Sequence, residues 1–198
     1  QTFDDILEAA LFGAWDNDEL VNGVTPTAFT VERRTPIGGG HSFKRFLGLV
    51  PNTFSLSVTA RQIVTGSVTF MGRGMELDDT AIAGATYADA NQNRIMTAAT
   101  SVGSLAIGGV SPAPRIRALT LEVNNNLRAQ DEIGNLFNAG VAPGDCLVSG
   151  SLEAYFSSAA LAQAYLDHDD VSLEFTLGDD SGSRYRILVP TIKLTGDL

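Results

Sequence analysis

The sequence is poor in the residues that build disulfides, metal centres and nucleophilic sites. Its 198 residues include one cysteine, Cys146, and two histidines, His41 and His168. A single cysteine cannot form an intrachain disulfide, and neither histidine lies near Cys146 in sequence to serve as a base for a thiol nucleophile. We therefore predict that Cys146 is an inert residue buried in an apolar strand.

Long apolar runs and basic clusters are also missing. No uninterrupted apolar run approaches the roughly 18 to 20 residues that a membrane-spanning helix requires, so we expect no membrane anchor. Acidic residues outnumber basic ones by 23 to 13, which gives a net charge of −10, and the longest basic cluster is the pair Arg33-Arg34. A protein that grips DNA needs cations to replace condensed counterions, so this composition disfavours direct nucleic-acid binding. Taken alone, the charge is that of an ordinary hydrated acidic surface.

The acidic residues form no recognisable catalytic or metal-binding pattern. Acid–base catalysis needs paired groups whose environments separate their pKa values, whereas adjacent acids in turns point apart and are screened by solvent. His168 lies among aspartates, but this spacing without a second histidine or a cysteine is a weak metal pattern. No Gly-x-Ser-x-Gly elbow is present, and the glycines at 38–40 lack the Gly-Lys-Ser/Thr ending of a phosphate loop. We predict no catalytic, cofactor-binding or metal-binding residues and no enzyme activity.

Most of the chain has the alternating pattern of β-strands. Apolar residues at helical spacing predict an amphipathic helix over residues 1–15, and Asn22-Gly23 between apolar residues predicts a hairpin turn. A second short helix is predicted to follow Ser157. A turn is expected at Val50-Pro51-Asn52. The predicted strands cover residues 27–34, 42–49, 53–59, 63–71, 115–123, 145–156, 171–177 and 184–189.

Residues 73–114 depart from this pattern. Between Gly72 and Pro114 the sequence is dominated by small and polar residues, with few and scattered apolar ones. Structureless segments of more than about 12 to 15 residues are uncommon in compact domains unless they have a function or a partner. We therefore predict a long irregular excursion that needs a role or a partner to explain it.

A short internal repeat suggests a sheet architecture in two parts. Residues 64–69 (VTGSVT) align with residues 148–153 (VSGSLE) at an offset of 84. Glycine in a strand interior marks a bend or a close backbone approach, so Gly66 and Gly150 are predicted at matching bends. We predict a mainly β fold, an antiparallel β-sandwich or flattened barrel with one or two short flanking helices.

Several phrases, in order along nearly the whole chain, resemble those of one known family. They lie at residues 4–11, Trp15, and residues 30–34, 46–48, 52–56, 63–72, 125–128, 148–150 and 188–190. Together they resemble the major tail-tube protein family of long-tailed, siphovirus-type bacteriophages. The resemblance implies a tail-tube-like domain over residues 1–198 that assembles with itself into six-fold rings, which stack into a hollow tube. It also implies contacts with other tail proteins at the tube ends, and a role for the 73–114 excursion between subunits.

The resemblance changes the interpretation of the acidic charge. A lumen that bound phosphates would trap the passing genome, whereas a negative wall lets DNA pass without specific binding. The predicted lumen-lining residues are the adjacent acids Asp78 and Asp79, Asp169 and Asp170, and Asp179 and Asp180. The implied location is the virion tail, with synthesis in the host cytoplasm. Relatives carry strands before the opening helix, so these residues are expected to be a portion of a longer subunit.

Three other interpretations of the sequence remain open. Another ring-forming tail component, such as a terminator or a baseplate hub, would share most of these features. A β-sandwich binding module would be expected to expose aromatic side chains for its ligand. An enzyme on a jelly-roll scaffold would need histidines or carboxylates that converge on one pocket.

Overall fold

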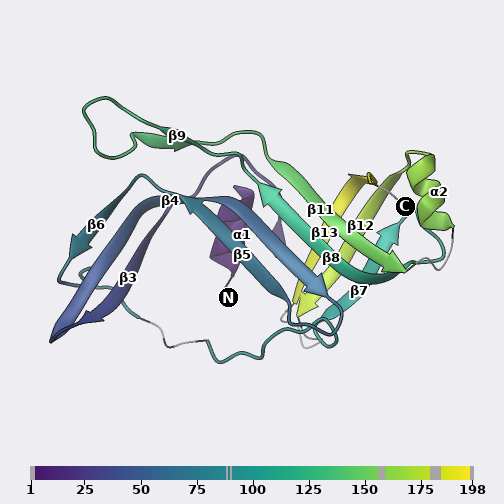
Figure 1. Ribbon diagram of the computed structural model, residues 1–198, viewed down its shortest axis with the longest axis horizontal. Coiled ribbons are helices and arrows are strands. Elements are labelled where there is room, and N and C mark those ends of the chain that lie inside the picture. Colours follow the sequence, from purple (N-terminus) through teal and green to yellow (C-terminus); the bar gives the residue numbers. More distant parts are fainter. Residues whose placement is uncertain (1–2, 88, 90, 156–158, 179–183, 197–198) are drawn as a thin grey trace. The chain divides into compact units, whose positions relative to one another are not determined.

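In the part of the chain that the structure describes, antiparallel β-sheets are accompanied by two short helices (Figure 1). The computed structural model describes residues 3–87, 89, 91–155, 159–178 and 184–196. The helices are α1 (Asp4–Leu11) and α2 (Ala160–Leu166). The strands are β1 (Trp15–Asp16), β2 (Glu19–Leu20), β3 (Phe29–Ile37), β4 (Gly40–Thr59), β5 (Thr65–Met71), β6 (Gly74–Asp78), β7 (Val102–Gly108), β8 (Arg115–Asn124), β9 (Arg128–Gln130), β10 (Gly140–Ala142), β11 (Leu147–Tyr155), β12 (Asp170–Gly178) and β13 (Arg184–Lys193).

The sheets of the described residues remain open and do not close into a barrel, which agrees with the sandwich-like alternative of the predicted fold class. The largest sheet has the order β11-β8-β4-β3, and β5 and β6 also pair with β4. A three-stranded sheet has the order β13-β12-β7, and β1-β2 and β9-β10 form two small pairs. The mainly β fold with two short helices is therefore confirmed.

The residues group into two compact units by their internal contacts. Unit 1 contains residues 1–55, 66–91 and 122–149, and unit 2 contains residues 56–65, 92–121 and 150–198. The segments of the two units alternate along the chain, so neither unit corresponds to one continuous stretch of sequence.

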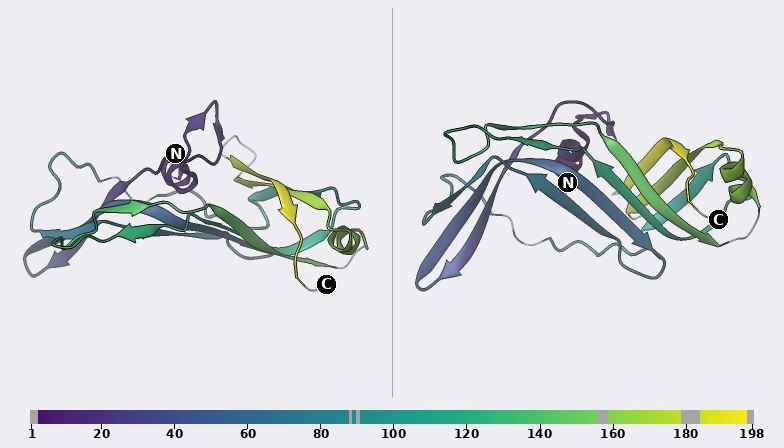
Figure 2. Two further views of the ribbon diagram at one scale, coloured as in Figure 1. Left: turned by 90° about the horizontal axis from the view of Figure 1, so that it is seen from above. Right: turned by 45° about the horizontal axis from the view of Figure 1, so that its top comes forward.

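In unit 1, helix α1 lies on one face of the strands and is held there by a buried amide (Figure 2). The Asn125 side chain, 2% exposed, donates from Nδ2 to the carbonyl of Ala10 at 2.9 Å and to that of Pro51 at 3.1 Å. Ala9 and Ala10 form the buried side of the helix. A single side chain therefore connects the helix to strand β4.

The predicted opening helix and hairpin were wrong in their extent and position. The helix ends at Leu11 because Phe12 adopts a left-handed conformation (φ 53°). The first hairpin turns at Asn17 and Asp18, whose φ angles of 48° and 63° fit the left-handed positions of a two-residue hairpin turn. Gly23 has a different role: a Cβ there would lie 2.2 Å from the Phe12 carbonyl oxygen, so glycine allows the close backbone approach.

Strand β4 corrects a second prediction. The turn expected at Val50-Pro51-Asn52 does not exist, because β4 continues through these residues for 20 residues in all. Val50 and Pro51 are buried, and Asn52 accepts backbone N–H groups at both its carbonyl and its side chain. Tertiary contacts thus override the local turn preference of proline and asparagine.

Residues 73–114 were predicted to be irregular, and this prediction was wrong in part. It contains β6, which pairs with β4, and β7, which pairs with β12. The burial of Ile107 in β7, and of Val110 just after the strand, explains why the scattered apolar residues still support a strand. A role for this segment between subunits stays a prediction.

Unit 2 contains the predicted C-terminal hairpin. Strand β12 alternates buried and half-buried residues, and it pairs with β13 on one side and β7 on the other. Phe175, at 0% exposure, lies in the middle of β12. The short helix expected after Ser157 is α2, although Ser157 itself lies outside the described residues.

Candidate functional site

Cross-strand pairs of hydroxyl groups mark the strands that carry the internal repeat. In unit 1, strands β4 and β5 are joined by Ser55 Oγ and Ser67 Oγ at 2.8 Å, and by a hydrogen bond between the hydroxyls of Thr53 and Thr69. The Thr53 amide also donates to Thr69 Oγ1 at 3.2 Å. These pairs form a row of small, uncharged polar groups on the sheet surface.

A matching pair occurs in unit 2, on the strand that carries the second copy of the internal repeat. Thr120 Oγ1 on β8 and Ser151 Oγ on β11 lie 2.7 Å apart, and Ser151 is the repeat equivalent of Ser67. Arg117 and Glu153 form an exposed ion pair at 2.6 Å on the same two strands. At Gly150, a Cβ would lie 2.3 Å from the Thr120 carbonyl oxygen, so a close backbone approach explains this glycine.

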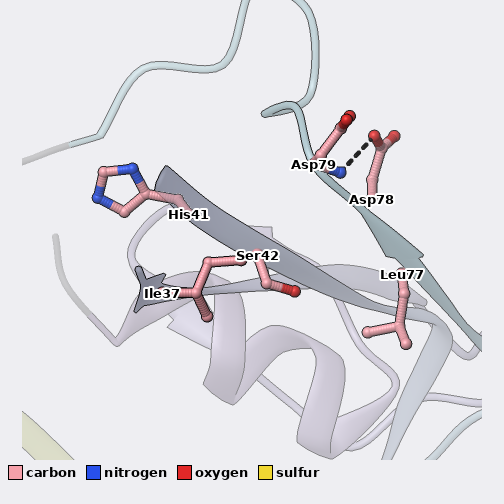
Figure 3. Close-up of a pocket in the computed structure, with 6 residues that line it drawn as sticks. All are labelled: Ile37, His41, Ser42, Leu77, Asp78 and Asp79. Atoms are coloured by element: carbon pink, nitrogen blue, oxygen red, sulfur yellow. Dashed lines mark hydrogen bonds between the residues drawn. The ribbon is translucent and has the colours of Figure 1, made fainter. Parts of the chain in front are cut away.

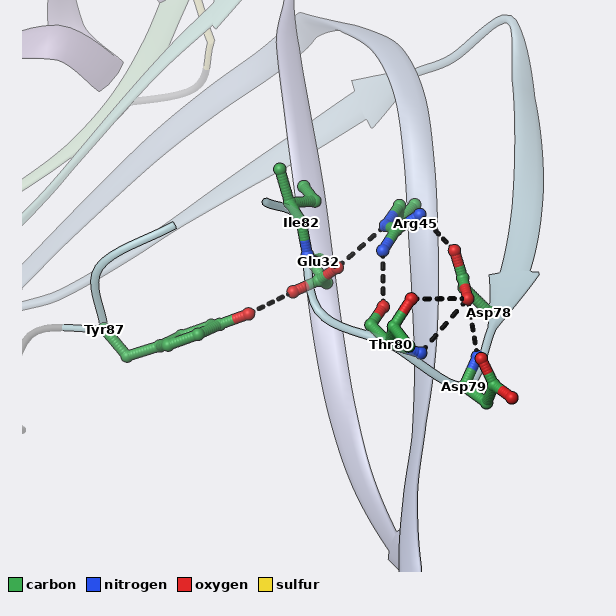
Figure 4. Close-up of polar contacts among 7 residues, drawn as sticks. All are labelled: Glu32, Arg45, Asp78, Asp79, Thr80, Ile82 and Tyr87. Carbon is green, nitrogen blue, oxygen red and sulfur yellow. Dashed lines mark hydrogen bonds and ion pairs between the residues drawn. The ribbon is translucent and has the colours of Figure 1, made fainter. Parts of the chain in front are cut away.

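A second polar cluster lies in unit 1 and is centred on Arg45 of β4 (Figure 4). Its guanidinium contacts Glu32 Oε2 on β3 at 2.8 Å, Asp78 Oδ2 at the end of β6 at 2.8 Å, and the Thr80 carbonyl at 2.6 Å. The Arg45 and Glu32 side chains are only 15% and 7% exposed. One cation thus joins three strands through two carboxylates.

The same cluster attaches residues 79–87 to the sheet. The Tyr87 hydroxyl donates to Glu32, and the Ile82 amide donates to Glu32 Oε2 at 3.3 Å. The hydrogen bond from Tyr87, followed by the contacts with Arg45, lowers the pKa of Glu32 in spite of its desolvation. Hydrogen bonds from the Thr80 amide and hydroxyl, then from Arg45, lower the pKa of Asp78. Both carboxylates are therefore held in the charged form.

We expect the attachment of residues 79–87 to weaken in acid. Because the pKa values of Glu32 and Asp78 are lower in the folded protein, their contribution is complete above about pH 5 and is lost as the pH falls through the folded-state values. Hydrogen exchange at the Ile82 amide, corrected for the intrinsic pH dependence of exchange, should lose protection only as the pH falls below the ordinary titration range of glutamate. In Glu32→Gln this pH dependence should largely disappear. Protection of this amide that stays unchanged while NMR shows Glu32 becoming protonated in the unmodified protein would contradict the assignment.

A shallow depression of about 350 Å³ lies at the tip of the β3–β4 hairpin, beside the end of β6 (Figure 3). Its lining residues are Ile37, His41, Ser42, Leu77, Asp78 and Asp79. The depression combines aliphatic and polar groups, but its Asp78 carboxylate is already bound by Arg45 and by Thr80. It therefore offers a contact surface and no evident chemistry.

The structure separates the predicted acidic residues into different environments. Asp78 is compensated by Arg45, while Asp79 is exposed on the adjoining turn. Asp170 pairs with Lys193 at 2.8 Å, while Asp169 is exposed. Asp179 and Asp180 lie outside the described residues. Whether any of the six lines a channel stays a prediction.

The remaining sequence predictions concern Cys146 and metal sites. Cys146 is exposed in a non-strand segment, so its predicted burial was wrong; Asn22 Nδ2 lies 3.5 Å from its sulfur. Across the described residues, no three histidine, cysteine, aspartate or glutamate side chains lie together as metal ligands would. None of the described helices is both long and apolar enough to cross a membrane.

Sequence reasoning missed the Arg45 cluster. Its acidic partners, Glu32 and Asp78, are 13 and 33 residues away, and no local pattern links them. The hydroxyl pairs did have a signal, because Ser and Thr alternate with apolar residues over 53–59 and 65–69. That alternation was interpreted only as a strand pattern.

Comparison with known families adds one finding. The model of a family described as phage tail tube protein matches residues 1–197, which is nearly the whole chain. A search of curated proteins finds no match.

Proposed function

The chain belongs to the phage tail tube protein family, and we propose that its copies form six-membered rings that stack into the hollow tube of a phage tail. The family is a structural one and gives the chain a role in the tail of the virion. The match over residues 1–197 carries this proposal, and the open antiparallel sheets support it. In this role the chain is made in the host cytoplasm, contacts other tail proteins at the tube ends and has no catalytic activity.

Ring formation would use the free edge of strand β11. In the described sheet, β11 ends the strand order, and most of its residues are exposed. An exposed edge strand invites pairing with another chain, and a ring supplies that partner in every copy. The sheet would then continue from one copy to the next.

The channel wall would carry the hydroxyl pairs together with acidic residues. Serine and threonine hydroxyls offer no fixed cation to a passing duplex, and the net charge of −10 opposes counterion exchange with DNA. Ser67 and Ser151 are therefore candidate wall residues in addition to the acids predicted from the sequence. DNA would pass without specific binding.

Electron microscopy of the purified protein tests the proposal. Hollow filaments of constant diameter are the expected result, because a tube subunit must contact copies both within and between rings. Single rings that never stack would favour a terminator or baseplate hub. Monomers that bind sugars in calorimetry would favour a binding module.

Reversing the charge of predicted wall acids is expected to slow genome ejection. We would test Asp79→Lys, Asp169→Lys and the double change of Asp179 and Asp180 to lysine, leaving the compensated Asp78 and Asp170 intact. A lysine ring on the wall would contact phosphates within a screening length of roughly 8 to 10 Å. Ejection from assembled particles should slow in at least one variant and recover in high salt.

Substitution of the same acids by asparagine is the control, because asparagine removes the negative charge without adding a positive one and keeps nearly the same side-chain size. Asparagine variants should eject faster than their lysine counterparts at low salt. Normal ejection by all three lysine variants, once microscopy shows intact tubes, would remove these acids from the channel wall.

A further inference from the structure

The hairpin sheet of β3, β4 and β6 in unit 1 has two unlike faces. Successive residues of a strand point to opposite faces, and the register aligns Glu32 with Arg45 and Phe43 with Asp78. The Arg45 cluster therefore occupies one face, where Ile82 and Tyr87 bind Glu32 (Figure 4). The chain's own residues 79–87 thus lie over this face.

The opposite face, which we call the open face, carries apolar side chains. It consists of Val31, Arg33, Lys44, Phe46, Met75 and Leu77, by the same register. Val31, Met75 and Leu77 are 42%, 40% and 69% exposed. A contiguous exposed apolar patch of this kind marks an interaction site.

The open face also carries uncompensated positive charge. Arg33 and Lys44 are direct cross-strand neighbours, and like charges in that position destabilise a sheet. Among the described residues, no carboxylate lies within 4.0 Å of either side chain, and Lys44 instead lies over the Phe46 ring. The face therefore fits a partner that combines apolar and acidic groups.

A loop with these properties lies elsewhere in unit 1. We call residues 131–136 the apolar loop. Its Ile133 and Leu136 side chains are 104% and 92% exposed. The loop begins with two acidic residues, Asp131 and Glu132. No other part of the described chain covers these two aliphatic side chains. The loop thus complements the open face in both charge and polarity.

Local contacts fix the apolar loop in place. The Asn135 amide donates to the Glu132 carbonyl at 3.3 Å, and its side chain donates to Glu132 Oε2 at 2.6 Å. The Phe137 ring lies against the backbone of Gly74, and the Asn138 amide donates to the Arg73 carbonyl at 3.0 Å. A fixed loop loses little entropy when it docks, which favours a specific contact.

We propose that the apolar loop of one copy docks on the open face of a neighbouring copy. Ile133 and Leu136 would cover the aliphatic residues of the face, with Asp131 and Glu132 beside Arg33 and Lys44. A second copy is the partner because each chain carries both complementary surfaces, which makes a heterologous, repeating contact. This inference rests on the proposed function, which supplies the neighbouring copy.

Charge reversal on each surface tests the contact. The face-reversed variant carries Arg33→Glu and Lys44→Glu, and the loop-reversed variant carries Asp131→Lys and Glu132→Lys. Each alone should reduce the pelleted, assembled fraction about tenfold or more, because like charges then meet at the contact. An equimolar mixture of the two should assemble, since each loop then finds a face of opposite charge. Recovery in the mixture also shows that both variants are folded.

A matched control separates this contact from net charge. The variant with Arg61→Glu and Arg94→Glu has the same net charge as the face-reversed variant but keeps both contact surfaces, so it should assemble alone. In a mixture it should not carry the loop-reversed variant into the pellet as the face-reversed variant does. Normal assembly of both reversed variants alone, or equal pelleting of the loop-reversed variant with the control, would overturn the inference.

Failure of the proposed function would look different. In that case the unmodified protein would form no tubes, and sedimentation velocity would replace pelleting as the readout. Association in the mixture of reversed variants, and in neither variant alone, would still support the contact between loop and face. Association in no sample would overturn it.

Discussion

Leu152→Pro is expected to leave the subunit folded and to abolish tube growth. The Ser151 amide donates to Thr120 Oγ1 at 3.0 Å, so it points toward β8. Because alternate residues of a strand direct their N–H groups to opposite sides, the Leu152 amide points to the free edge of β11. Proline removes this donor and its ring blocks an incoming strand, which edge strands tolerate in the isolated subunit.

Two controls make this result interpretable. Leu152→Ala loses a similar amount of side-chain packing but keeps the amide, so it should fold and form tubes. Ser151→Pro removes an amide that the subunit itself uses, so it should lower the melting temperature. Circular dichroism would report folding and electron microscopy assembly. Normal tubes from a folded Leu152→Pro subunit would rule out pairing through this edge.

Phe175→Ala is expected to give the largest loss of folding free energy from one side chain, about 3 to 5 kcal/mol. Phe175 has 0% exposure and lies on the central strand of the β13-β12-β7 sheet. Removing its ring takes away buried apolar surface and leaves a cavity that flanking strands cannot readily close. Since the free energy of unfolding of small proteins is only about 5 to 15 kcal/mol, this substitution would remove much of it.

Leu188→Ala is the control for this substitution. Leu188 lies on the neighbouring strand β13 but is 50% exposed, so its truncation should cost less than about 1 kcal/mol. Urea unfolding followed by circular dichroism measures both variants. Similar midpoints for the two would show that Phe175 does not anchor the core of unit 2.

The sequence predicted those elements whose local pattern and tertiary contacts agree. The C-terminal hairpin is such a case, because alternation in β12 coincides with burial on one face. The opening hairpin is the opposite case. Asn22-Gly23 has the stronger local turn signal, but the turn lies at Asn17-Asp18, and Gly23 provides room for the Phe12 carbonyl. A glycine needed for space and a glycine needed for a turn look alike in one sequence.

The candidate surfaces were harder to predict than the fold. Arg45 binds carboxylates on two other strands, so its role depends on a register that the sequence does not reveal. Apolar residues of the open face, such as Leu77, have the same pattern as core residues, since periodicity identifies a face but not what covers it. Ile133 and Leu136 likewise resemble ordinary loop residues until their exposure is known.

The interleaving of the two units has a consequence for how the chain unfolds. The sequence passes between the units at five places, and four of these passages lie inside strands β4, β5, β8 and β11. Unravelling one unit would therefore pull on strands that continue into the other. No single cut in the chain releases either unit as a fragment with all of its own strands. The connectivity thus favours cooperative unfolding. We expect a single transition in which both units unfold together.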